Sequence, residues 1–260
     1  MEHKLVVTLT TDFGTNDHYA GVLKGALLRA SPHAVLIDIS HAVKAFDIVQ
    51  AALIVQNAYP EFPENTIHIV GVNCVYATDF RFLAVRASGH FFLAPDNGLL
   101  ALLFEHLPEA DVRVLADPYP AHFPGKSAFA DAVAHLAEGK PFEEMGLPAG
   151  NLVERIGLRP VITPTRIRGT VIHIDNFDNV LVNIRRETLE NATKGRSFSL
   201  FFKRNDPITT LSNNYCDVPV GESLCLFNSA GLLEIAVNMG RAATLLGLKL
   251  EDVVEVVFDE

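Results

Sequence analysis

The sequence predicts a two-domain protein, an α/β domain followed by a smaller β domain. In the first 107 residues, short β-branched runs alternate with segments whose apolar residues repeat at helical spacing. Beyond about residue 160, short strand patterns dominate. The first pattern is typical of βαβ units around a mainly parallel sheet, and the second favours an antiparallel barrel or sandwich. We therefore expect domains over residues 1–160 and 167–260.

Strands and helices are expected to alternate along the first domain. Runs of β-branched and other apolar residues predict the strands, and apolar residues spaced three and four apart predict the helices between them. The tetrapeptide Ala-Ser-Gly-His at residues 87–90 predicts the turn of a hairpin. In chain order, the expected elements are a strand over 4–11, a helix from His18, a strand over 35–39, a helix around Ile48, a strand over 66–72, a hairpin over 82–94 and a helix over 99–105.

The second domain is expected to consist mostly of strands. Two Xaa-Pro pairs, Arg159-Pro160 and Thr163-Pro164, punctuate the connection that precedes it. One helix is expected near residues 232–240 or just beyond, packed against the strands. The expected strands cover residues 169–174, 180–184, 198–202, 223–227 and 253–258.

Composition and charge exclude several classes of function. With 260 residues, of which 49% are hydrophobic and 20% charged, the chain is typical of a globular protein. Its net charge of -10 leaves no basic stripe for nucleic-acid phosphates. Three scattered cysteines and ten unclustered histidines predict neither a disulfide framework nor a metal site. Without a signal peptide or a membrane-spanning apolar run, we expect a cytoplasmic protein with no membrane partner.

Two carboxylates, Asp12 and Asp17, lie where the first expected strand ends and the first helix begins. In an open α/β sheet, ligands bind at this edge. One carboxylate can accept both hydrogen bonds of a vicinal diol, as in nucleotide sites that hold ribose, and an ammonium or sulfonium group gains from a second carboxylate. The alternative is structural, with Asp17 capping the helix and Asp12 serving as a turn residue.

Two further polar clusters lie in the second domain. At residues 174–180, Phe177 offers a stacking platform, and the Asn179 amide offers a donor and an acceptor for an adenine edge. At residues 226–231, a loop of small residues around Ser229 exposes backbone groups to the polar tail of a ligand. A plain hairpin turn is the alternative for each cluster.

Several short motifs follow one another in a fixed order along nearly the whole chain. They are Thr11-Asp12-Phe13-Gly14 with Asp17, Gly-Val-Leu-Lys-Gly at 21–25, Ile-Asp-Ile-Ser-His at 37–41, Ala-Pro-Asp-Asn-Gly-Leu-Leu at 94–100, Asp-Asn-Phe-Asp-Asn-Val at 175–180 and Asn-Ser-Ala-Gly-Leu-Leu-Glu-Ile-Ala at 228–236. In this set the chain resembles the S-adenosylmethionine (SAM) hydroxide adenosyltransferases, a family that includes fluorinating and chlorinating enzymes.

The resemblance implies an architecture and an assembly. It implies an N-terminal α/β domain, a C-terminal antiparallel β-barrel and a homotrimer. The ligand would lie between the N-terminal domain of one subunit and the C-terminal domain of a neighbour. It also implies an adenosyl ligand, with SAM as substrate or ligand and no further cofactor.

The resemblance also implies a set of binding residues. Asp12 would hold the ribose hydroxyls and Asp17 the methionine amino group, while Phe46 would line the pocket. The remaining implied contacts are those of Phe177 and Asn179 with adenine, of Tyr215 with the other face of adenine, and of Ser229 with the methionine carboxylate.

The chain departs from the family where water is activated. The hydrolases carry an Asp, an Arg and a His at positions that hold Asn73, Phe80 and Pro124 here. The catalytic residues are therefore unknown from the sequence, and Asp79, Arg81, His122 and Lys126 are the neighbouring candidates for compensation.

The reaction implied is an SN2 displacement in which water attacks the ribose C5′ and methionine leaves, so that SAM is hydrolysed to adenosine and methionine. The missing water-activating residues keep an alternative open. In that alternative the protein binds SAM or adenosine without catalysis.

Overall fold

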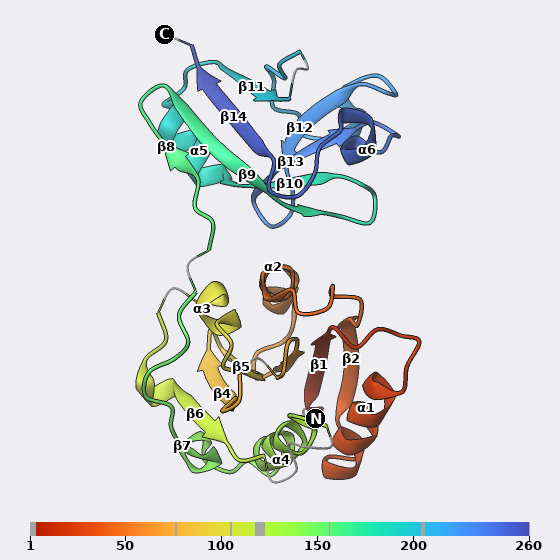
Figure 1. The fold of residues 1–260 in the computed structure, drawn as a ribbon, viewed down its shortest axis with the longest axis vertical. Coiled ribbons are helices and arrows are strands. Elements are labelled where there is room, and N and C mark those ends of the chain that lie inside the picture. The colour runs from red at the N-terminus through yellow and green to blue at the C-terminus, as the bar shows by residue number, and fades with distance from the viewer. Residues whose placement is uncertain are drawn as a thin grey trace. The chain divides into compact units, whose positions relative to one another are not determined.

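A computed structural model describes residues 4–75, 77–104, 106–117, 123–155, 157–203 and 206–259. The chain divides into two compact units, Met1–Gly157 and Leu158–Glu260, and each unit is described by itself (Figure 1).

The first unit is built on a mixed β-sheet with the strand order β2-β1-β3-β5-β4-β6-β7. Its first half is parallel, because β1 pairs in parallel with β2 and β3, and β3 pairs in parallel with β5. Its second half is antiparallel, through the pairs β4–β5, β4–β6 and β6–β7. The strands are β1 (Val6–Thr11), β2 (Val35–Ser40), β3 (Ile67–Gly71), β4 (Phe82–Ala87), β5 (His90–Pro95), β6 (Val112–Leu115) and β7 (Leu147–Pro148).

The expectation of a mainly parallel sheet is therefore only partly correct. The hairpin of β4 and β5, which the sequence predicts, reverses the chain direction within the sheet. The later strands β6 and β7 then extend the antiparallel half.

Helices cover both faces of this sheet (Figure 1). On one face, α1 and α4 pack Leu23, Leu27 and Phe129 into one core with strand residues Leu9 and Ile69. On the other face, α2 and α3 contribute to a second core with β3, β4 and β5. The helices are α1 (Tyr19–Ala30), α2 (Ile48–Ala58), α3 (Leu99–Leu103) and α4 (Lys126–Ala137), with short 3₁₀ turns η1 (Tyr59–Glu61), η2 (Glu109–Asp111) and η3 (Phe142–Met145).

The second unit is a curled antiparallel sheet with the strand order β11-β14-β9-β10-β13-β12, and β8 pairs with β9. Isolated bridges join Ile208 to Leu200 of β11 and Leu211 to Cys225 of β12, so residues 208–211 link the two edge strands. The elements are β8 (Val161–Ile162), β9 (Arg166–Ile174), β10 (Val180–Arg185), α5 (Arg186–Thr193), β11 (Phe198–Phe202), η4 (Tyr215–Asp217), β12 (Ser223–Phe227), β13 (Leu232–Val237), α6 (Ala242–Leu246) and β14 (Val253–Phe258).

The helix expected near residues 232–240 or just beyond lies just beyond, as α6. Residues 232–237 instead form the strand β13, which pairs with β10 and β12. All six of its residues are buried, because Leu233 and Ile235 face one core while Ala236 faces another. A strand buried on both faces has a continuous apolar pattern that periodicity does not separate from a helix.

In the described part of the chain, the helices are too short or too polar to cross a membrane.

Candidate functional site

Asp12 follows β1 directly and lies at the carboxyl end of the parallel strands. Its Oδ2 accepts hydrogen bonds from the backbone N–H groups of Phe46, at 3.0 Å, and Asn73, at 3.1 Å. These donors come from the segments that follow β2 and β3, the two neighbours of β1 in the sheet. The described hydrogen bonds to this carboxylate all end on Oδ2, which leaves Oδ1 available to a ligand donor.

Both donors to Asp12 have a left-handed backbone, with φ of 69° at Phe46 and 50° at Asn73. Such conformations cost non-glycine residues of the order of 1 kcal/mol or more and cluster at functional sites. Here the cost is offset by two charge-assisted hydrogen bonds to one carboxylate oxygen. Phe46 itself is 71% exposed.

The segment around Asn73 is held by a residue to which the sequence analysis assigned no role. The buried Asn97 amide donates to the carbonyls of Val72, at 3.0 Å, and Asn73, at 3.1 Å, while its Oδ1 accepts from the N–H of Leu99. One side chain thus joins the start of α3 to the segment that orients Asp12. Its position in the motif at residues 94–100 was the signal available in the sequence.

Asp17 is exposed just before α1, and the structural alternative for it is wrong. The N-cap of α1 is His18, and no side chain caps that helix. The Asp17 carboxylate therefore does not serve as a cap. Beside it, the rings of Phe13, Tyr19 and Phe123 pack with centroid separations of 5.4–6.3 Å.

In the second unit, Asp175 organises the loop between β9 and β10. Its Oδ1 accepts from the N–H groups of Phe177, at 2.9 Å, and Asn179, at 2.8 Å, and its Oδ2 accepts from the Asn179 amide at 3.3 Å. The loop is thus a hairpin turn, a conformation that is compatible with ligand binding by its side chains. Phe177 is 75% exposed at its tip, whereas Asn179 is buried.

Tyr215, another predicted residue of the second unit, contacts the strand β13 through a hydrogen bond. The Tyr215 hydroxyl donates to Oε1 of the buried Glu234 over 2.7 Å. Burial, with the nearby charge of Asp175, raises the pKa of Glu234 although Tyr215 and Asn228 donate to it. Burial and the hydrogen bond to Glu234 also raise the pKa of Tyr215. The apolar residues of β13 on either side of Glu234 give no sequence signal for a polar contact there.

Ser229 is exposed at the tip of the turn between β12 and β13. Asn228 closes this turn, because its Oδ1 accepts from the N–H groups of Ala230, at 3.0 Å, and Leu232, at 3.1 Å. This loop is also a hairpin turn, and it leaves the Ser229 side chain exposed.

Comparison with known protein families identifies the family of this chain. The family model of the SAM hydroxide adenosyltransferase N-terminal domain matches residues 7–146, and that of the C-terminal domain matches residues 169–255. The chain belongs to the SAM hydroxide adenosyltransferase family.

Individual members of the family are similar over nearly the whole chain. An (R)-S-adenosyl-L-methionine hydrolase of Thermus thermophilus is 32% identical over 257 residues, which cover 94% of this chain and 96% of the relative. One of Methanocaldococcus jannaschii is 27% identical, with 97% and 96% covered. A fluorinase of Actinoplanes sp. is 26% identical, with 94% of each chain covered.

A solved structure is similar as well. It is that of an uncharacterized conserved protein from Thermotoga maritima, with a TM-score of 0.87 and 29% identity. The match covers 97% of this chain and 100% of that one.

The structure describes the surroundings of Asn73, Phe80 and Pro124, the three positions at which the family resemblance implies a departure from the hydrolases. Phe80 packs against the buried ring of Phe82, with centroids 5.8 Å apart, and Pro124 precedes Gly125, the N-cap of α4. Asn73 contacts Asp12 through its backbone, as described above.

Of the neighbouring candidates for compensation, Arg81 is fully committed to the fold. Its Nε and Nη2 contact the buried Asp96 at 2.8 and 2.6 Å. Its other contacts are with the carbonyls of Ala149, at 2.8 Å, and Asn151, at 2.5 Å. Asp79 is exposed and Lys126 is the first residue of α4, while His122 lies outside the described residues.

Cys74 lies beside the Asp12 site with its thiol protonated. Burial raises the pKa of this thiol, and the carboxylates of Asp12 and Asp117 raise it further. A thiol in this state is a poor nucleophile. Within the described ranges, no group of His, Cys, Asp and Glu side chains is arranged to hold a metal ion.

Proposed function

We propose that this protein is an S-adenosyl-L-methionine hydrolase that releases adenosine and methionine. The observation that carries the proposal is Asp12, whose Oδ2 is held by two backbone donors while Oδ1 is left for a ligand. Relatives named (R)-S-adenosyl-L-methionine hydrolase, at 27% and 32% identity over nearly the whole chain, supply the substrate and the reaction.

In this proposal, each predicted residue contacts one part of the substrate. Asp12 accepts from the ribose hydroxyls, Asp17 binds the methionine ammonium group and Phe46 lines the pocket. Phe177 stacks on adenine, and the Asn179 amide, oriented by Asp175, pairs with its edge. Two further contacts complete the set, those of Tyr215 with adenine and of Ser229 with the methionine carboxylate.

The reaction needs alignment more than activation of the leaving group. The water oxygen forms a bond to C5′ as the C5′–S bond breaks, and the bonding electron pair returns to sulfur. Methionine leaves as a neutral thioether, and the extra proton passes to solvent. Because a sulfonium is already a good leaving group, the protein contributes mainly by orienting and desolvating the water. No further cofactor takes part.

One observation favours a second candidate function, binding of SAM or adenosine without catalysis. The three positions expected to activate water hold Asn73, Phe80 and Pro124, and the neighbouring Arg81 is occupied by Asp96 and two carbonyls. A missing general base costs about 10²- to 10⁴-fold in rate.

We further propose a homotrimer that binds its small-molecule ligand between the N-terminal unit of one subunit and the C-terminal unit of a neighbour. Light scattering on the purified protein tests the trimer. Mixing Asp12→Ala subunits with Asn179→Ala subunits tests the shared site, because only a site between subunits can combine two intact halves. Recovered activity in the mixture supports the proposal, and its absence contradicts it.

Product analysis in ¹⁸O-labelled water tests the reaction. The protein is incubated separately with each sulfonium epimer of SAM, and the products are analysed by mass spectrometry. Adenosine that carries ¹⁸O, together with methionine, is expected above the rate without protein and is expected to be lost in Asp12→Ala. Intact SAM that binds to the protein would instead support the second candidate.

A further inference from the structure

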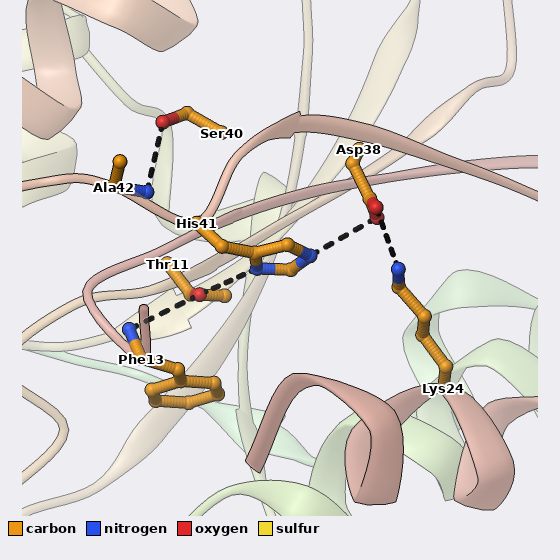
Figure 2. Close-up of polar contacts among 7 residues, drawn as sticks. All are labelled: Thr11, Phe13, Lys24, Asp38, Ser40, His41 and Ala42. Atoms are coloured by element: carbon orange, nitrogen blue, oxygen red, sulfur yellow. Dashed lines mark hydrogen bonds and ion pairs between the residues drawn. The ribbon is translucent and has the colours of Figure 1, made fainter. Parts of the chain in front are cut away.

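A chain of polar contacts leads from the protein surface to the residue before Asp12 (Figure 2). Lys24 Nζ of α1 lies 2.5 Å from Asp38 Oδ2, and Asp38 Oδ1 lies 3.1 Å from His41 Nε2. His41 Nδ1 lies 2.8 Å from the Thr11 hydroxyl. The outer members are partly exposed, whereas His41 and Thr11 are buried.

The partners define where the protons of this chain lie. Because the Asp38 carboxylate only accepts, the proton of the His41 ring is placed on Nε2, which faces Asp38 Oδ1 at 3.1 Å in a polar contact whose geometry falls short of a hydrogen bond. In neutral His41, Nδ1 then accepts from the Thr11 hydroxyl, whose oxygen in turn accepts from the N–H of Phe13 at 3.3 Å. The polar contacts of this chain therefore run in one direction, from the Phe13 N–H through Thr11 and His41 towards Asp38.

The inner end of the chain holds the turn that carries Asp12. Thr11 and Phe13, the two neighbours of Asp12, are joined through the Thr11 hydroxyl. The backbone adds two links between the same segments, from Gly14 N–H to the His41 carbonyl at 2.7 Å and from Val43 N–H to the Thr11 carbonyl at 3.3 Å. His41 thus joins the turn after β1 to the segment after β2, which also supplies the Phe46 donor to Asp12.

The outer end keeps the His41 ring in place. Partial burial acts to raise the pKa of Asp38. The contacts with Lys24 and His41 outweigh this effect, so the pKa of Asp38 is lowered. Asp38 therefore remains an acceptor at neutral pH. A carboxylate that fixes the orientation and tautomer of a histidine is a recurrent way to position that histidine.

We infer that His41 is a positioning residue for ligand binding, because it holds the Asp12 turn so that the free carboxylate oxygen meets a vicinal diol. The inference rests on the proposed function, since it takes the ribose of an adenosyl ligand as the diol. Asp38 and Lys24 act on Asp12 only through His41.

The test compares two ligands that differ only in the diol. Binding of adenosine and of 2′,3′-dideoxyadenosine is measured by calorimetry for the wild type and for His41→Gln. The wild type is expected to favour adenosine by a factor of the order of 10², since two hydrogen bonds to a carboxylate are at stake. In His41→Gln we expect this preference to fall at least about fivefold, with dideoxyadenosine affinity nearly unchanged. A merely structural role would weaken both ligands alike and would overturn the inference.

Matched variants separate the possible causes. His68→Gln removes another buried histidine that contacts a threonine of β1, Thr8, at 2.7 Å, but lies outside the Asp12 site. Ser40→Ala removes a hydrogen bond from the segment after β2, from Ala42 N–H to Ser40 Oγ at 3.1 Å. Both variants are expected to keep the wild-type preference for adenosine. A loss as large as that of His41→Gln in either one contradicts a specific role for His41.

Two further variants keep the test decisive. Should His41→Gln not fold, Asp38→Ala at the partly exposed end carries the same test, with a smaller loss of preference for adenosine expected.

Asp12→Asn distinguishes a failure of the inference from a failure of the proposed function. If the wild type shows no preference for the diol and Asp12→Asn changes nothing, the ribose assignment fails, and the role of His41 with it. If Asp12→Asn removes the preference but His41→Gln and Asp38→Ala do not, only the role of His41 fails.

Discussion

The backbone N–H of Asn73 donates to Oδ2 of Asp12 over 3.1 Å. The position at which the family resemblance implies a water-activating aspartate thus lies against the carboxylate that we assign to the ribose. In this chain the contact uses only the backbone of Asn73. The amide side chain cannot take a proton from water at neutral pH.

Replacing Asn73 by aspartate should accelerate hydrolysis, because a carboxylate can accept a proton from water. Aspartate tolerates the left-handed backbone of Asn73 as asparagine does, so the bond to Asp12 should persist. For Asn73→Asp combined with Pro124→His, we expect adenosine release to rise by about 10²-fold, the lower end of what a positioned acid–base group contributes. Release of adenosine at saturating SAM is the measurement. The matched control is Asn65→Asp, another left-handed asparagine outside the site, for which no change is expected.

Loss of the Arg81 guanidinium should destabilise the N-terminal unit. Asp96 is 3% exposed and depends on Arg81 for its charge partner. We expect Arg81→Met to lower the free energy of unfolding in urea by about 3 kcal/mol, because an uncompensated carboxylate remains buried. Arg86→Met, which breaks more exposed ion pairs with Asp111 and Glu143, should cost about 1 kcal/mol or less. Equal losses in the two variants would contradict the assignment.

The buried His68 should make the protein less stable in acid. Burial, together with the nearby His90, lowers the pKa of His68 from 6.5 to about 4. As the pH falls from 6.5 to 4, the unfolded chain takes up a proton that the folded chain does not. Unfolding therefore becomes more favourable, by up to about 3 kcal/mol at 1.36 kcal/mol per pH unit. Unfolding in urea across this range should show the loss in the wild type and a smaller loss in His68→Gln.

Glu234 should have the opposite dependence on pH. Burial raises its pKa, so between the ordinary glutamate range and its raised pKa the folded chain holds a proton that the unfolded chain has released. Stability is then lost as the pH rises through this range. We expect the stability of wild type relative to Glu234→Gln to fall as the pH increases from 4.5 towards neutrality. Thermal unfolding at several pH values measures this change, and Glu222→Gln at an exposed position should track the wild type.

Much of the fold follows from local patterns in the sequence. The early strands and the hairpin of β4 and β5 were predicted from runs of β-branched residues and one turn. The helix α4 was not predicted, although Ala128, Phe129, Ala132 and Val133 of α4 lie at helical spacing. Likewise, the sequence of β13 is compatible with a helix, because the strand is buried on both faces and lacks alternation.

The sequence by itself determined the family, the presence of Asp12 at a strand end, and the loops that carry Phe177, Asn179 and Ser229. These features depend on neighbouring residues, which local patterns record. Only the tertiary structure decided which oxygen of Asp12 is occupied, because its donors lie 34 and 61 residues away. The same holds for the commitment of Arg81 to Asp96 and of Tyr215 to Glu234. Burial and hydrogen-bond partners arise when distant segments pack together, and hydrophobic periodicity carries no information about that pairing.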